Sequence, residues 1–435
     1  MNELATLVKE LEEQLIVCTR CGMCQSVCPL FEQTLYEADV ARGKLALLSG
    51  LMTHLFFDPD GVNKRLNKCL LCGSCAANCP SGVNVLEIFI KARAILTEYQ
   101  GLSFIKKIIF NQVLSNPPIF NILLVWAEKF QKIMAKNNKN IQGTSCARLV
   151  SPLLSHRHFM PIAKEPFHKS LGTLKLDSKM SSIKVAFFTG CLIDKIMPHI
   201  AHASVKALLH SNVDLVIPET QGCCGIPALA SGDRKTFDSL VKHHVNLFQK
   251  EKFDYLVTAC ATCTSTIKKL WPSLYQGKET SFMKYLDDLS KKTMDINQFI
   301  VDVMQIGSDE TDQDKKFSET VTYHDPCHLK KSLNIFTQPR QVITASGKYL
   351  KEMEGADKCC GMGGSFNLFY YDISSKIGKL KQDNITDTNC SIVASGCPAC
   401  IMQISDMLSK AGSNIQVKHS IEIYADSLEE SQLYE

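Results

Sequence analysis

The chain has 435 residues, which is too long for one ordinary core, so roughly two to four domains are expected. Its 45% hydrophobic and 21% charged residues are typical of a globular protein, and a formal net charge of +4 gives no nucleic-acid-binding footprint. The N-terminus lacks the apolar segment of a secretory signal, so we interpret the 20 cysteines as those of a reduced, cytoplasmic protein.

The first hundred residues contain a cysteine run, C-x2-C-x2-C-x3-C-P, that occurs twice. The two runs are Cys18, Cys21, Cys24 and Cys28, and Cys69, Cys72, Cys75 and Cys79. In bacterial ferredoxins with this spacing, three thiolates of one run hold a [4Fe–4S] cube, and the fourth ligates the other cluster. A single C-x2-C pair is often a zinc site, but the duplicated run with its proline is far more specific for iron.

We therefore expect two [4Fe–4S] clusters in which the fourth ligand comes from the other run. One cluster takes Cys18, Cys21, Cys24 and Cys79, and the second takes Cys69, Cys72, Cys75 and Cys28. Helical patterns at Leu35–Leu51 and Val62–Asn67 make the insertion between the runs longer than in compact, β-rich ferredoxins, and a further helical pattern, Val85–Tyr99, follows the second run. Residues 1–100 are accordingly predicted to be an all-α, two-cluster ferredoxin module.

Residues 101–182 contain no motif and are predicted to be a helical linker. Ile105–Leu114 and Ile119–Met134 are interpreted as helices joined by a proline turn, and Ser151–Ser182 as an irregular linker. Lysines along the second helix indicate a solvated face rather than a membrane-surface patch. No apolar run approaches the roughly 18 residues of a membrane span, so membrane contact is expected to be only peripheral or through a partner.

From Ile183 onward, short apolar strands alternate with helices, which indicates α/β units with a largely parallel sheet. The first unit has predicted strands at Ile183–Thr189, Asp214–Ile217 and Tyr255–Thr258, and a helix at Pro198–His210. The second unit has predicted strands at Thr320–His324 and Ile392–Ala394. The pattern of the first unit recurs in the second at a nearly constant offset, so we expect two tandem α/β domains, 183–310 and 320–430.

Each of these units carries a lone cysteine, then Cys-Cys-Gly, then C-x2-C. The first set is Cys191, Cys223, Cys224, Cys260 and Cys263, and the second is Cys327, Cys359, Cys360, Cys397 and Cys400. The interval from the lone cysteine to the pair is identical in both copies, and unrelated cysteines do not reproduce such an interval. Lone cysteines and C-x2-C motifs follow strand ends, where open α/β sheets bind ligands, and precede helices, whose N-termini favour thiolates.

The Cys-Cys-Gly pairs indicate a cluster other than a simple cube. Adjacent thiolates diverge along the chain, which suits a larger or opened cluster in which one sulfur bridges irons. Gly225 and Gly361 allow backbone conformations and a close approach that a Cβ would block. A dinucleotide-binding fingerprint at Gly361 is disfavoured, because no strand–Gly-x-Gly-x-x-Gly–helix order is present.

His324, Asp325 and His328 flank Cys327. We interpret them as hydrogen-bonding groups that orient the loop and tune the cluster potential, in preference to a proton relay. Cys146 and Cys390 fit neither pattern and are interpreted as small buried hydrophobic residues.

The chain resembles the iron–sulfur subunit of glycolate oxidase and its relatives in lactate dehydrogenases, anaerobic glycerol-3-phosphate dehydrogenase and heterodisulfide reductase. The resemblance is carried by Cys18-Thr-Arg-Cys-Gly-Met-Cys, Arg42-Gly-Lys, Asn78-Cys-Pro-Ser-Gly, Gln221-Gly-Cys-Cys-Gly and Tyr323-His-Asp-Pro-Cys-His. In heterodisulfide reductase, tandem Cys-Cys-Gly domains hold noncubane [4Fe–4S] clusters. Glycolate-oxidase-type subunits tend to lose a cysteine of the terminal C-x2-C. Both copies are intact here, which moves the sequence toward the lactate dehydrogenase and heterodisulfide reductase branches.

The resemblance implies an iron–sulfur electron-transfer subunit of a flavin-linked 2-hydroxyacid (lactate or glycolate) dehydrogenase. No flavin or nicotinamide fingerprint is present, so substrate oxidation is expected on a partner FAD-binding dehydrogenase subunit, with a quinone or an electron carrier protein as acceptor. It also implies one or two further noncubane-type clusters in the Cys-Cys-Gly domains. The alternatives are a heterodisulfide-reductase-like protein that cleaves a disulfide, and a non-catalytic redox sensor. Partners could hold this cytoplasmic protein at the inner face of the cell membrane.

Overall fold

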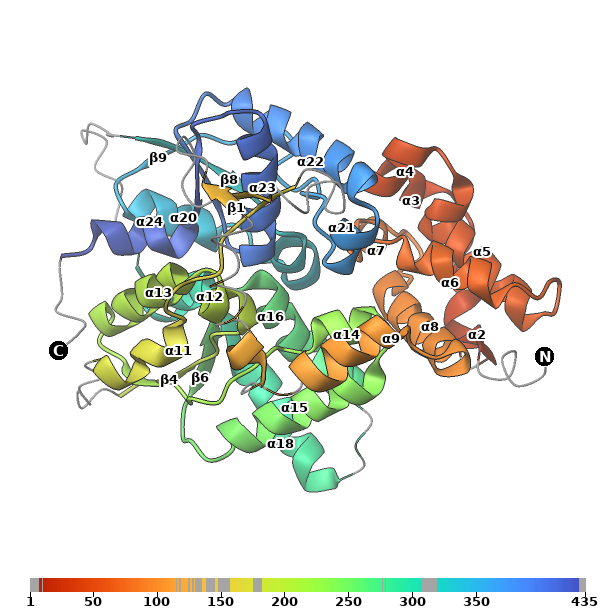
Figure 1. Cartoon of the computed structure of the whole chain (residues 1–435), viewed down its shortest axis with the longest axis horizontal. Coiled ribbons are helices and arrows are strands. Elements are labelled where there is room, and N and C mark those ends of the chain that lie inside the picture. Colours follow the sequence, from red (N-terminus) through yellow and green to blue (C-terminus); the bar gives the residue numbers. More distant parts are fainter. Residues whose placement is uncertain are drawn as a thin grey trace.

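A computed structural model of the chain describes residues 8–9, 11–114, 116, 119–123, 126, 129, 135–137, 145–147, 157–174, 182–275, 277, 279–306 and 319–429. The described chain forms a helical N-terminal part and two α/β domains. In Figure 1 the N-terminal part (red and orange) lies to the right, beside both the first domain (green) and the second domain (blue).

The described secondary structure of the N-terminal part is helical. Its elements are α2 (Glu12–Leu15), α3 (Met23–Ser26), α4 (Pro29–Thr34), η1 (Glu37–Asp39), α5 (Ala41–Met52), α6 (Pro59–Asn67), α7 (Ser74–Ala77) and α8 (Val85–Gln100). Apolar side chains of α5, α6 and α8 form one buried cluster. The predicted helices at Val62–Asn67 and Val85–Tyr99 are confirmed. The prediction that a helix begins at Leu35 is wrong, because Leu35 has a left-handed φ of 55° and ends α4.

The segment after α8 is more varied than a helical linker. It contains α9 (Phe104–Lys107), the π-helix η2 (Ile108–Leu114), α11 (Phe167–Ser170) and η3 (Leu171–Thr173). It also contains a small antiparallel sheet of β1 (Ala135–Asn137), β2 (Ser145–Ala147) and β3 (His158–Phe159), which was not predicted. Most of the helix predicted at Ile119–Met134 lies outside the described residues.

Part of the predicted irregular linker is anchored to the second α/β domain. The guanidinium of Arg157 donates to the carbonyl of Asn367 at 2.7 Å, and the backbone N–H of His158 donates to the Asp406 carboxylate at 2.9 Å. Phe167 is buried in the core of the first domain instead. The segment therefore contacts both domains.

Each α/β domain is built on a four-stranded parallel sheet. The first sheet has the order β5 (Asp214–Val216), β4 (Lys184–Phe187), β6 (Tyr255–Thr258), β7 (Thr293–Asp295). The second has the order β9 (Tyr349–Leu350), β8 (Thr320–His324), β10 (Ile392–Ser395), β11 (Gln416–His419). The two orders are the same strand for strand. In both sheets the order reverses between the first and third strands of the domain, and open α/β sheets bind ligands at such a switch point.

Helices complete the two domains. Those of the first are α12 (Cys191–Lys195), α13 (Pro198–His210), α14 (Ile226–Ala230), α15 (Arg234–Phe248), α16 (Ala261–Ser265), η4 (Thr266–Leu270), α17 (Trp271–Leu274), α18 (Thr280–Lys292), α19 (Ile296–Gln298) and η5 (Phe299–Val303). Those of the second are η6 (His328–Leu333), α20 (Gln338–Ala345), α21 (Ser365–Phe369), α22 (Tyr371–Thr386), α23 (Pro398–Lys410) and α24 (Ser420–Ser427). The predicted helix at Pro198–His210 and the strands at Tyr255–Thr258 and Thr320–His324 are confirmed with the same bounds. Among the described helices, none is long and apolar enough to cross a membrane.

Candidate iron–sulfur sites

Two cavities in the N-terminal part divide the eight ferredoxin-type cysteines into two groups of four. One cavity is lined by Cys18, Cys21, Cys24 and Cys79, with Cys75 at its edge. The other is lined by Cys28, Cys69, Cys72 and Cys75. These groups coincide with the ligand sets predicted from the sequence, including the exchange of the cysteine before each proline. We call them the first and second ferredoxin sites.

Short helices and prolines direct the thiols into these cavities. Cys24 and Cys75 lie on α3 and α7, which pack against each other. Cys28 is the N-cap of α4, and Pro29 occupies the first turn, where the absent N–H costs no hydrogen bond. Cys75 also lines the first cavity. The two sites are therefore adjacent.

The Arg42-Gly-Lys motif of α5 supplies a basic residue to each ferredoxin site. Arg42 lines the first cavity, and its guanidinium donates to the carbonyl of Arg20 at 3.2 Å. Lys44 lines the second cavity and is buried. Burial lowers the pKa of Lys44, while the thiolates of Cys69 and Cys28 oppose that shift. In the sequence this motif was one of those that carry the family resemblance. Its position at the two cavities is seen only in the structure.

In the first α/β domain, the sheet's switch point brings the cysteines together. Cys191 begins α12 after β4, and Cys260 caps α16 after β6. The thiols lie close enough to shift one another's pKa: Cys191 and Cys224 act on Cys223, Cys223 and Cys263 act on Cys224, and Cys224 and Cys260 act on Cys263. We call this set of five thiols the first-domain site.

The second domain repeats this arrangement. Cys327 follows β8, and Cys397 follows β10 and caps α23, which also carries Cys400. The thiols of Cys359 and Cys400 lie beside Cys360 and lower its pKa, and those of Cys360 and Cys397 lie beside Cys400 and raise its pKa. Burial raises the pKa of the Cys327 thiol well above its usual value. The nearby thiolates of Cys359, Cys360 and Cys397 raise it further. These five residues form the second-domain site.

The C-x2-C loops of the two domains contact each other. The Cys260 and Cys397 thiols lie side by side, and the Thr262 hydroxyl lies 3.5 Å from the Cys397 Sγ. The backbone N–H of Ala261 donates to the carbonyl of Gly396 at 3.1 Å. The first-domain and second-domain sites therefore adjoin.

A second contact connects the ferredoxin part with the second domain. The Cys72 and Cys359 thiols lie side by side, and the Lys331 ammonium donates to the Ser74 hydroxyl at 2.7 Å. Leu30, Leu70, Cys359, Phe366 and Ile377 pack in one buried cluster around this contact. The four sites thus lie in one row: first ferredoxin, second ferredoxin, second domain, first domain.

The chemistry of these donors fits iron–sulfur clusters. Burial raises the pKa of the Cys75 thiol well above its usual value, and the neighbouring thiolates of Cys69 and Cys72 raise it further. The pKa of Cys28 is raised to about 11, chiefly by burial. Crowded thiols of this kind ionise together only when cations lie between them, and soft thiolates select iron–sulfur clusters.

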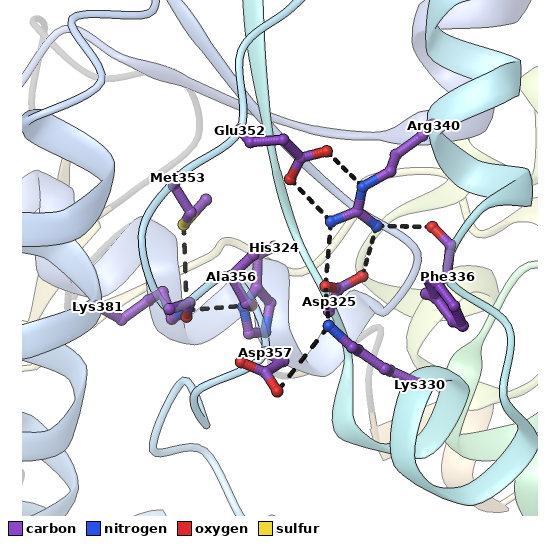
Figure 2. A network of polar contacts seen from close by, with 11 residues as sticks. His324, Asp325, Lys330, Phe336, Arg340, Glu352, Met353, Ala356, Asp357 and Lys381 are labelled. Atoms are coloured by element: carbon purple, nitrogen blue, oxygen red, sulfur yellow. Dashed lines mark hydrogen bonds and ion pairs between the residues drawn. The ribbon is translucent and has the colours of Figure 1, made fainter.

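An ion-pair network holds the loop before Cys327 (Figure 2). The buried Asp325 carboxylate accepts two hydrogen bonds from Arg340, at 2.7 and 3.1 Å, and one from Lys330 at 3.1 Å. Its backbone N–H donates to the carbonyl of Ala356, three residues before Cys359. This geometry agrees with the predicted loop-orienting role of Asp325.

Other sequence-predicted residues have different surroundings. The ring of His328 lies beside the backbone of Leu71, so it contributes to the contact between the ferredoxin part and the second domain. Cys390 is buried away from the motifs, as predicted. The side chain of Cys146 lies outside the described residues. Lys381, which sequence reasoning missed, is buried near the thiols of Cys360 and Cys359.

Comparison with known proteins identifies the same parts of the chain. The family model for a cysteine-rich domain matches residues 185–268 and 321–405, and the model for a 4Fe-4S dicluster domain matches residues 14–83. The matched ranges contain the cysteine motifs described above.

Curated relatives cover most of the chain. The probable glycolate oxidase iron-sulfur subunit of Bacillus subtilis is 26% identical, over 94% of this chain and 92% of its own. A component of the dihydromethanophenazine:CoB–CoM heterodisulfide reductase of Methanosarcina barkeri is 26% identical, over 95% and 94%. Lactate utilization protein A of a Geobacillus species is 31% identical, over 55% of this chain and 98% of its own. The resemblance inferred from the motifs is confirmed: the chain belongs to the family that contains lactate utilization protein A and the glycolate oxidase iron–sulfur subunit.

Proposed function

We propose that this chain is the iron–sulfur electron-transfer subunit of a flavin-linked 2-hydroxyacid dehydrogenase, with lactate or glycolate as substrate. The observation that carries the proposal is the row of four adjoining cysteine sites. Relatives named for glycolate oxidase and lactate utilization support the substrate class. Iron–sulfur clusters bound at such sites take up and release single electrons, which complements a flavin that accepts a hydride.

We propose the eighteen motif cysteines as the cluster ligands. Residues 1–100 form the all-α module with two [4Fe–4S] clusters, and residues 101–182 connect it to the Cys-Cys-Gly domains at 183–310 and 320–430. The five thiols of each domain suit a noncubane-type cluster. Gly225 and Gly361, which follow the two cysteine pairs, have left-handed φ values of 92° and 93° that a residue with a Cβ rarely adopts.

Side chains along the row of sites stabilise the negative charge of reduced clusters. Arg42 and Lys44 place positive charge at the two ferredoxin sites, and Lys381 places it at the second-domain site. The apolar cluster around Cys359 excludes water from the contact between the ferredoxin part and the second domain. Both features stabilise charge in a low-dielectric environment.

Substrate oxidation is assigned to a partner FAD-binding subunit. Electrons then leave to a quinone or a carrier protein, and any contact with the inner face of the cell membrane is through such partners. The proposed location is the cytoplasm, where free thiols are maintained.

A second candidate function is disulfide cleavage of the heterodisulfide-reductase type. Two observations favour it: all ten cysteines of the Cys-Cys-Gly domains are intact, and the two domain sites meet at Cys260 and Cys397. The heterodisulfide reductase component of Methanosarcina barkeri is a full-length relative.

One experiment separates the two functions. The native complex is purified under anaerobic conditions, and D-lactate, L-lactate and glycolate are added separately while cluster absorbance is followed. We expect a flavoprotein in the complex and bleaching by one of the acids. If no flavin is present, and only a disulfide reoxidises chemically reduced clusters, the dehydrogenase proposal is wrong and disulfide cleavage replaces it.

A further inference from the structure

The two α/β domains differ at the residue that follows or ends their first strand. Phe188 follows β4, and His324 ends β8; each stands three positions before the lone cysteine of its domain. Phe188 is buried and packs against His244 and Trp271, with ring centroids 5.2 and 6.4 Å apart. An apolar ring thus lies where the second domain has an imidazole.

His324 is directed into the second-domain site. A ring nitrogen of His324 and the Sγ atoms of Cys360 and Cys400 all lie within 4.8 Å of one another. His324 Nδ1 lies 3.2 Å from the carbonyl oxygen of Ala356, while Nε2 is buried and has no hydrogen-bond partner. Nε2 is therefore the nitrogen available to a metal.

The contact with Ala356 determines which nitrogen carries the proton. A carbonyl oxygen only accepts hydrogen bonds, so the ring donates from Nδ1 (Figure 2). With Nδ1 donating to Ala356, the other nitrogen of the neutral ring is Nε2, which has no donor of its own to satisfy. Nε2 then presents a lone pair, and metal-binding histidines characteristically donate their other N–H to a backbone carbonyl or a carboxylate.

A buried lone pair without a hydrogen-bond donor is unfavourable, and a cation held by the ring and the two thiols would satisfy it. We propose that His324 Nε2 is a ligand to iron at the second-domain site, beside Cys360 and Cys400. This inference rests on the proposed function, because it requires a cluster in the second domain. It makes the two domain sites different: the first is held by thiolates, and the second by thiolates and one imidazole.

The mixed ligand set has a functional consequence. On the iron that His324 binds, the imidazole takes a position that a bridging thiolate fills in the first-domain site, and exchange of thiolate for neutral imidazole on an iron raises the reduction potential, as in Rieske centres. The second-domain site should therefore have a higher potential than the first-domain site. Two domains with the same strand order would then hold clusters with different reduction potentials.

The test is pulsed EPR of the full chain labelled with ¹⁵N-histidine, in the paramagnetic state of the second-domain cluster. We expect the coupling of a directly bound ¹⁵N in the wild type and its loss in His324→Phe, which introduces the residue of the first domain. His244→Phe is the matched control. His244 Nε2 already accepts from the Gly222 N–H at 3.0 Å, and its Nδ1 lies 2.8 Å from the Leu240 carbonyl. This control should keep the coupling.

A second readout is the midpoint potential of the same cluster, which should fall in His324→Phe and not in His244→Phe. A second-domain cluster whose spectrum lacks the bound-nitrogen coupling, or retains it in His324→Phe, would overturn the inference and leave the electron-transfer proposal intact. A second domain without any cluster signal would overturn both, so the two failures are distinguishable.

Discussion

Replacing Cys28 with alanine should abolish the same EPR signal as replacing Cys69, although the two cysteines belong to different runs with a helical insertion between them. Both thiols line the second ferredoxin cavity, whereas the cysteines next to Cys28 in its own run line the first. Each variant should lose about four irons per chain, the content of one [4Fe–4S] cluster. Iron and sulfide analysis together with EPR of the reduced protein measures both effects.

Two further variants make this result specific. Cys79→Ala should abolish the other ferredoxin signal, the one that Cys21→Ala also removes. Cys390→Ala alters a buried cysteine outside the motifs and should leave the iron content unchanged. Cys28→Ala and Cys21→Ala should remove different signals. If both variants remove the same signal, each run holds its own cluster, contrary to the grouping in the structure.

Replacing Gly361 with alanine should strongly destabilise the second domain. The residue has a φ of 93°, and a Cβ would lie 2.6 Å from the backbone oxygen of Ser374 and 3.2 Å from the Gly378 nitrogen. Strain in the left-handed region and the clash with α22 together should cost about 3 kcal/mol of unfolding free energy. Anaerobic thermal unfolding and the iron content of the second-domain site measure the loss.

Two other glycines separate strain from clash. Gly412→Ala also has a positive φ, 66°, but its Cβ would meet nothing within 4 Å, so it should cost only about 1 kcal/mol. Gly225→Ala would place its Cβ 2.9 Å from the Phe237 ring, which can shift, so its cost should be intermediate. Equal losses in Gly361→Ala and Gly412→Ala would refute the role of the close approach to α22.

The sequence predicted those features that are encoded over short distances. The ferredoxin spacing is local, and the strands at β6 and β8 are short, contiguous apolar runs, so they were found with correct bounds. Strands β9 and β11 were missed because they are only partly buried and their apolar pattern is weak. The start of α5 was misplaced because the break at Leu35 depends on a left-handed backbone that leucine rarely adopts.

The order of the sites could not be predicted, because it depends on contacts between distant segments. Cys72 contacts Cys359, and Cys260 contacts Cys397, although each pair comes from two different domains. Their proximity follows from the docking of α4 on α22 and from the contact of the two C-x2-C loops. The sequence likewise could not distinguish the three polar neighbours of Cys327. In the structure Asp325 forms an ion pair, His324 has a ring nitrogen without a partner, and His328 lies at the contact between the ferredoxin part and the second domain.

If the four sites act in series, loss of the second ferredoxin site in Cys28→Ala interrupts electron transfer along the row. The variant is assembled with the native partners, given the acid that bleaches the wild-type clusters, and freeze-quenched for EPR. We expect the remaining signals to divide into two groups. Those on one side of the missing second ferredoxin site are reduced as in the wild type, and those on the other side stay oxidised. Reduction of every remaining signal at the wild-type rate would contradict electron transfer in series.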